Sequence, residues 1–220
     1  MNFTCMLSCL SLLLAAVAAQ QPKPCEAPPL LSGDFSWIFG HGLTSTGKFD
    51  YDATAKRSRI RELRKTGNST EFMDQLTLFS ESAFYIIDWA TTTCTKWKLD
   101  EEFIPMSVPE DAKLFGQFFM GSSSSSGTGV LVNNWYGSVP GNGTYSYVFT
   151  DNGCVPISLT TYNPYDGWAT LSTYNWVEGI IRPQDFFPPR FCDGARLEET
   201  KQPLTFFTAL QYLANSILDE

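Results

Sequence analysis

Residues 144–157 read TYSYVFTDNGCVPI and contain the pattern that decides the fold. Tyr145, Tyr147 and Phe149 alternate with smaller or polar side chains, so in an extended strand all three project from the same face. The following Asp151-Asn152-Gly153 favours a tight turn, and a second β-prone run comes after it. We therefore predict an antiparallel hairpin with one strongly aromatic face.

The same pattern extends along most of the chain. Aromatic side chains alternate in residues 35–39 and 49–51, and further β-prone runs occupy residues 57–63, 76–79, 84–87, 93–99, 130–136 and 168–177. Many strands at short spacing, joined by polar turns, predict an antiparallel all-β domain. Since period-2 alternation gives each sheet one apolar face, two such faces must cover each other or enclose a ligand.

Composition excludes several classes of function. The 220 residues include 15 Lys and Arg against 23 Asp and Glu, a net charge of −8, which argues against a nucleic-acid partner and against adsorption to anionic membranes. The single histidine, His41, rules out multi-histidine zinc or haem sites. No nucleophile motif accompanies it, so we expect no catalytic residues and no enzymatic activity.

The N-terminus indicates the compartment. Residues 5–19 form an uncharged apolar run that ends in small residues before Gln20, which is typical of a secretory signal peptide. The run is too short for a transmembrane helix, and no later segment is long and apolar enough. We therefore predict a signal peptide at residues 1–19, no transmembrane segment, and a secreted, extracellular protein.

The cysteines and sequons agree with export. Cys25, Cys94, Cys154 and Cys192 remain after the predicted signal peptide, and an even number in an exported chain predicts two disulfides. Four cysteines allow three pairings, which spacing alone does not separate. Sequons at residues 68–70 and 142–144 predict N-glycosylation of Asn68 and Asn142.

Four cysteine-centred segments carry a resemblance to a known family. They are residues 24–28 (PCEAP), 87–96 (IDWATTTCTK), 152–156 (NGCVP) and 186–192 (FFPPRFC). In this order and spacing they resemble the ependymin-related secreted glycoproteins, and the stretch FDYD at residues 49–52 and Asn134-Trp135 add to the likeness. The resemblance covers residues 24–192.

This resemblance implies a fold, a pairing and an assembly. The implied architecture is bacterial-lipoprotein-carrier-like: two stacked, curved antiparallel sheets enclose a deep hydrophobic pocket, often in a homodimer. The implied disulfides join Cys25 to Cys154 and Cys94 to Cys192. We accordingly assign residues 20–192 to an ependymin-like β domain and residues 193–220 to a C-terminal tail.

The tail has a helical pattern from about Pro203. Apolar residues recur at spacings of three and four, at Leu204, Phe207, Leu210, Ala214 and Ile217. Pro203 suits the first turn of a helix. We predict a helix that either packs on the edge of the sheet or contributes to a dimer.

The predicted ligand pocket collects apolar side chains of the alternating runs: Phe35, Trp37, Phe39, Phe84, Ile86, Tyr145, Tyr147, Phe149 and Trp168. A filled sandwich core would use the same alternation. Aromatic residues make up 15% of the chain, however, and supply wide, stiff walls that suit an apolar cavity. The main expectation is a secreted glycoprotein that binds or carries a hydrophobic, lipid-like small molecule or lipid.

Two other expectations follow from the family. The first is calcium association, with candidate oxygen ligands at Asp50, Asp52 and residues 100–102 and 110–111, although Ala55 occupies the position where an EF-hand loop needs glycine. The favoured interpretation of these carboxylates is that they are solvated turn residues which keep an acidic protein soluble, and we expect no other cofactor. The second is a structural function in extracellular matrix, including calcified shell matrix, or in cell-matrix adhesion.

Overall fold

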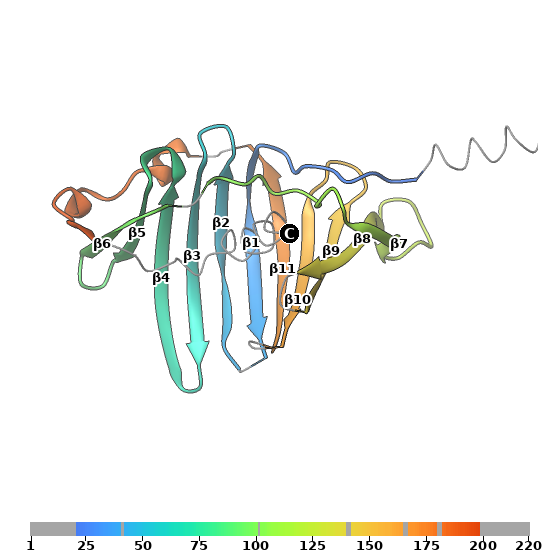
Figure 1. Ribbon diagram of the computed structural model, residues 1–220, viewed down its shortest axis with the longest axis horizontal. Coiled ribbons are helices and arrows are strands. Elements are labelled where there is room, and N and C mark those ends of the chain that lie inside the picture. The colour runs from blue at the N-terminus through green and yellow to red at the C-terminus, as the bar shows by residue number, and fades with distance from the viewer. Residues whose placement is uncertain are drawn as a thin grey trace, which may run out of the picture.

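The computed structural model describes residues 21–40, 42–100, 102–139, 142–164, 167–179 and 182–198. Figure 1 shows one broad sheet crossed at one end by two irregular segments. The predicted signal peptide, His41 and the predicted helix after Pro203 lie outside the described residues.

The chain forms mostly hairpin-connected strands, with short 3-10 turns. Their bounds are β1 (Leu30–Phe39), β2 (Thr44–Asp52), β3 (Arg57–Thr66), β4 (Ser69–Leu78), η1 (Phe79–Glu81), β5 (Ala83–Asp88), β6 (Thr93–Lys98), β7 (Lys113–Gly121), β8 (Gly129–Val139), β9 (Gly143–Thr150), β10 (Pro156–Asn163), β11 (Gly167–Glu178), η2 (Pro183–Phe186), η3 (Arg190–Cys192) and β12 (Leu197–Glu198).

The expected curved antiparallel all-β architecture is confirmed, including the hairpin of β9 and β10. The strands form a single twelve-stranded sheet in the order β12-β6-β5-β4-β3-β2-β1-β11-β10-β9-β8-β7, where we expected two stacked sheets. The reason is that β1 pairs with β2 on one side and with β11 on the other. This pairing joins the N-terminal strands β1–β6 and the C-terminal strands β7–β11 into one sheet. Alternation within a strand gives no information about such a distant partner.

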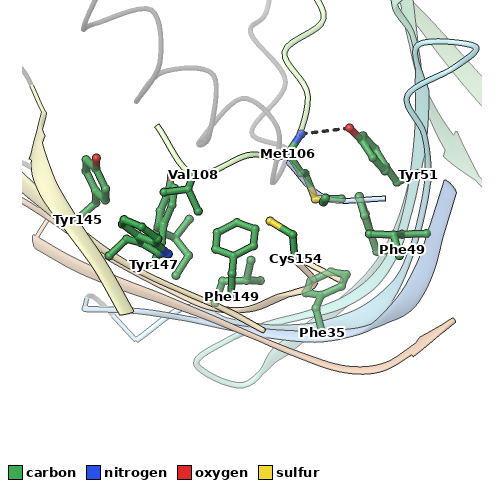
Figure 2. Packing of buried hydrophobic residues seen from close by; sticks show 14 of the residues in the cluster. Phe35, Phe49, Tyr51, Met106, Val108, Tyr145, Tyr147, Phe149 and Cys154 are labelled. Carbon is green, nitrogen blue, oxygen red and sulfur yellow. Dashed lines mark hydrogen bonds between the residues drawn. The ribbon is translucent and has the colours of Figure 1, made fainter. Parts of the chain in front are cut away.

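Register brings apolar side chains from distant strands into one row. Trp37 of β1 is paired with Leu171 of β11, and the row continues through Leu159, Tyr147 and Trp135 on β10, β9 and β8. All five are buried. Figure 2 shows the sheet curving beneath the side chains of this face, which is therefore the concave face.

Two irregular segments cover the concave face: residues 22–29 and the strap, which we define as residues 102–112. Backbone amides join them, with Ala27 donating to Met106 and Val108 donating to Cys25, both at 2.8 Å. The amide of Met106 also donates to the Tyr51 hydroxyl at 3.1 Å, the contact drawn in Figure 2. The Cys25–Cys154 disulfide ties this cover to the turn between β9 and β10.

The opposite, convex face has its own cover around β3–β6. Phe186 and Cys192 pack there on a buried cluster that includes Leu76 and Ile87. Beside it, Arg59 and Asp74 form a buried bidentate ion pair with bonds of 2.8 and 2.7 Å. The Cys94–Cys192 disulfide joins β6 to η3 in this region. Both disulfides implied by the family resemblance are therefore present.

Candidate ligand-binding site

The concave face holds a continuous set of buried apolar side chains, which we call the aromatic basin: Leu31, Phe35, Trp37, Phe49, Tyr51, Ile60, Trp135, Tyr145, Tyr147, Phe149, Leu159 and Leu171. Met106 and Val108 of the strap pack onto it. The rings of Tyr145 and Tyr147 are 4.8 Å apart, and those of Trp37 and Phe39 are 5.2 Å apart. The basin is therefore lined by stiff, close-packed rings.

Most of the predicted pocket residues share this face. Phe35, Trp37, Tyr145, Tyr147 and Phe149 belong to the basin, and Phe39 packs against it.

Phe84 and Ile86 project from β5 on the same face, because register connects Ile86 through Gln75 and Ile60 to Phe49. They lie apart from the basin, since the buried polar side chains of Gln75 and Thr77 come between them and it.

Trp168 lies on the convex face with Tyr162, their rings 4.8 Å apart, and is 58% exposed. Leu171 is three residues further along β11 and faces the basin, so period-2 alternation puts Trp168 on the other side. The structure does not bring Trp168 together with the other predicted pocket residues.

The basin also contains residues that the predicted pocket omitted. Phe49 and Tyr51 alternate as clearly as Tyr145 and Tyr147, so their pattern was sufficient to find them. Met106 and Val108 lie outside the named strands, on either side of Ser107, which forms an isolated antiparallel bridge with Glu26. Their alternation spans only three residues, which is too short to predict a buried strand from the sequence. Leu159 and Leu171 are single aliphatic residues whose burial depends on the register between strands.

Two small hollows reach into the basin. One is lined by Met106, Tyr147, Phe149, Leu159 and Leu171 among others, and has a volume of about 10 Å³. The other lies beside Phe35, Phe49 and Trp176 and has a similar volume of about 10 Å³. Each has room for about one water molecule. A hydrocarbon chain therefore enters these hollows only if the strap or the side chains beneath it move.

Three tyrosines bring hydroxyl groups into this apolar region. Burial raises the pKa of Tyr51 to about 12 and that of Tyr147 well above its ordinary value. Burial, assisted by the charge of Asp111, raises the pKa of Tyr145 to about 12. Desolvation disfavours the phenolate, so these hydroxyls are neutral hydrogen-bonding groups at physiological pH.

Three of the candidate calcium ligands form ion pairs with basic side chains. Asp50 pairs with Arg61 at 2.6 Å, Asp52 with Arg57 at 2.9 Å, and Asp100 with Lys98 at 2.6 Å. In the described part of the chain, no three His, Cys, Asp or Glu side chains lie together in a group that could hold a metal ion.

Comparison with known proteins identifies the family. The family model described as Ependymin matches residues 67–192. Ependymin-2 of Carassius auratus is 34% identical over 196 residues, covering 87% of this chain and 90% of that protein. The chain belongs to the ependymin family. Ependymin of Notemigonus crysoleucas is 33% identical over 195 residues, with 87% of this chain and 90% of that protein covered.

A solved structure shares the architecture of this ependymin-family chain. It is an uncharacterized conserved protein from Thermus thermophilus, with a TM-score of 0.51 at 11% identity, covering 87% of this chain and 99% of that one. At this identity the similarity concerns the fold alone. Among the described residues, no helix of this ependymin-family member has the length and apolar character needed to cross a membrane.

The raised tyrosine pKa values predict a loss of stability in alkali. Tyr51 and Tyr145 have folded pKa values of about 12, above the value of about 10 expected in the unfolded chain. Their contribution to stability is therefore fully present below pH 10 and is lost as the pH rises from about 10 to about 12.

Denaturant unfolding at a series of pH values tests this prediction. We expect the free energy of unfolding to fall above about pH 10, and to fall less steeply in Tyr51→Phe and Tyr145→Phe, each compared with its own value at neutral pH. Identical slopes in the wild type and in both variants would contradict the assignment.

Proposed function

We propose that this ependymin-family chain is a secreted glycoprotein that binds a lipid-like ligand on its concave face. The observation that supports this most is the aromatic basin, whose buried side chains come from strands across the sheet. In the described residues, the basin is covered by the strap and residues 22–29, which share one isolated bridge between Glu26 and Ser107 and do not form a second sheet. A cover of this kind separates locally at lower cost than a second sheet does.

The free energy of apolar burial favours the exchange of the strap for a hydrocarbon chain. Lifting Met106 and Val108 off the basin costs about 3 to 6 kcal/mol of apolar burial. Breaking the three hydrogen bonds of the strap, two of them to Ala27 and Cys25 and one to Tyr51, costs about 3 kcal/mol. An acyl chain of about 14 methylenes would contribute about 11 kcal/mol on burial in their place.

Extracellular location is the second part of the proposal. The apolar run at residues 5–19 is typical of a signal peptide, and disulfides such as Cys25–Cys154 and Cys94–Cys192 persist in oxidising compartments. Such an environment also permits glycosylation of the sequons.

Glycans would leave the strap accessible. Asn68 and Asn142 are exposed in the β3–β4 and β8–β9 turns. Antiparallel pairing across the sheet puts these turns at one end of the strands, whereas the Cys154 turn that anchors the strap is at the other end. We propose that calcium associates through these glycans, since Asp50 and Asp52 form ion pairs with arginines.

Ligand uptake is the direct test of this function. We expect the glycosylated mature protein to carry an apolar adduct in native mass spectrometry, or to take up a fluorescent fatty-acid probe that hexadecane displaces. Leu171→Phe fills the hollow beneath the strap and should weaken uptake about tenfold.

Thr170→Phe is the matched control, because it adds the same ring one residue away on the convex face and should leave uptake unchanged. Wild-type protein with no adduct and no uptake would contradict the proposal and favour the alternative of a structural matrix protein.

We propose that a second copy of the chain completes the assembly at the β7 edge. In the described residues β7 ends the sheet, so the outward backbone groups of this strand have no strand beside them. The convex side of this edge exposes apolar side chains, which we call the edge patch: Phe115 (69% exposed), Phe118, Met120, Val130 and Tyr136.

Charge favours a second copy as the occupant. The chain carries a net charge of −8, so two copies repel each other over most orientations. Strands β7 and β8 contain no Asp or Glu and one Lys, so this edge offers the least repulsion. Antiparallel pairing of β7 with its own copy has twofold symmetry and satisfies the free backbone groups.

Sedimentation of patch variants tests this assembly. The double substitution Phe115→Asp and Phe118→Asp should convert a dimer to monomers, because it puts like charges into a symmetric apolar contact. Phe72→Asp is the control, since Phe72 on β4 is comparably exposed but remote from β7 in the sheet order. A monomeric wild type, or a dimer that survives the double substitution, would contradict the assignment.

A further inference from the structure

Two hydrogen-bond donors in the aromatic basin have no partner among the described residues. They are the indole N–H of Trp135, a residue 2% exposed, and the hydroxyl of Tyr145, a residue 3% exposed. Buried polar groups in proteins almost always have partners, and leaving one unsatisfied is unfavourable. A pair of such donors on one face of the sheet therefore marks a position for an acceptor from outside the described residues.

Register makes Trp135 and Tyr145 diagonal neighbours on one face of the sheet. Trp135 is paired with Tyr147, and Gly137, two residues further along β8 on the same face, is paired with Tyr145. The Tyr145 ring lies directly over Gly137, where a β-carbon would collide with the ring and its hydroxyl. Glycine at this position thus lets the Tyr145 ring lie against β8, the strand that carries Trp135 two residues away.

The donors adjoin the hollow beneath the strap. Tyr147 lines that hollow, and its ring is 4.8 Å from the ring of Tyr145. Figure 2 shows Tyr145 beside Tyr147 on the concave side of the sheet, and the Tyr145 hydroxyl lies over Gly137 of β8. A molecule whose hydrocarbon part lay against Tyr147 and Phe149 would have its polar end within reach of this position.

The charges around the basin are acidic. The charge of Asp111 raises the pKa of the Tyr145 hydroxyl, and the charge of Glu26 acts in the same direction on Tyr51. A carboxylate or phosphate brought to this position would be repelled, whereas an uncharged acceptor oxygen would not.

We propose that Trp135 and Tyr145 recognise the polar end of a neutral lipid, an ester or amide carbonyl that accepts their hydrogen bonds while the hydrocarbon chain lies in the basin. This inference rests on the proposed lipid-binding function and specifies its ligand class. Gly137 is a positioning residue in it, because it sets where the Tyr145 hydroxyl lies.

Competition against a bound fluorescent hydrocarbon probe tests the inference on the glycosylated, disulfide-bonded mature chain. The competitors are monooleoylglycerol, oleate and octadecene, which offer a neutral ester, a carboxylate and no acceptor. We expect wild-type protein to bind monooleoylglycerol more tightly than oleate. Tyr145→Phe and Trp135→Phe should each weaken monooleoylglycerol about three- to tenfold and leave octadecene unchanged.

Two further variants separate recognition from a structural effect. Gly137→Ala keeps both donors but displaces the Tyr145 hydroxyl, so it should cause the same selective loss. Tyr174→Phe removes a hydroxyl that bonds to Ser36 on the convex face, and should change neither affinity.

The outcomes distinguish this inference from the proposed function. Failure of wild-type protein to bind either octadecene or monooleoylglycerol would overturn the lipid-binding function itself. A second outcome is that wild-type protein binds octadecene and monooleoylglycerol, but Tyr145→Phe and Trp135→Phe change neither affinity or weaken the two affinities equally. This outcome would overturn the inference alone and mean that water satisfies the donors. Oleate binding as tightly as monooleoylglycerol would overturn the neutral ligand class.

Discussion

The pairing of β1 with β11 is the constraint on which the rest of the structure depends. It joins the early hairpins to the late ones and aligns Trp37 with Leu171, which continues the buried row through Leu159 to Tyr147. Because side chains alternate with a period of two, a slip of one residue here would turn the aromatic side chains of β1 away from those of β9. The continuity of the basin from β1 to β9 requires this register, and the donor pair requires in addition the pairing of β8 with β9.

The concave face is covered by the irregular strap, whereas the inner face of a β-sandwich is covered by a second sheet. Cys25–Cys154 keeps the cover attached to the sheet, and closing a separation of 129 residues also stabilises the fold by about 5 kcal/mol on the chain-entropy model. Attachment through one covalent link and a few hydrogen bonds permits local opening without loss of the sheet. The acidic surroundings then discriminate among the molecules that could enter.

Local alternation was enough to predict the all-β class and the basin residues Tyr145, Tyr147 and Phe149, whose strand carries its own pattern. Local alternation did not predict the face on which Trp168 lies. The pairing of β11 with β1 and β10 decides which of its side chains are on the concave face, and the aromatic content of β11 does not. Phe84 and Ile86 share the concave face, yet polar residues of β4 separate them from the basin, which only long-range register reveals. The burial of Met106 was not predicted, since its segment lies outside the strands and pairs only through the single bridge between Ser107 and Glu26.

The central claim is that the strap opens while the sheet stays folded. Hydrogen exchange at the amides of Met106 and Val108, which bond to Tyr51 and Cys25, tests it most directly. The account predicts that both amides exchange through local opening, at a free energy well below that of global unfolding, and that they slow when monooleoylglycerol is added. Exchange of these amides only at the free energy of global unfolding, and without change on addition of lipid, would contradict it.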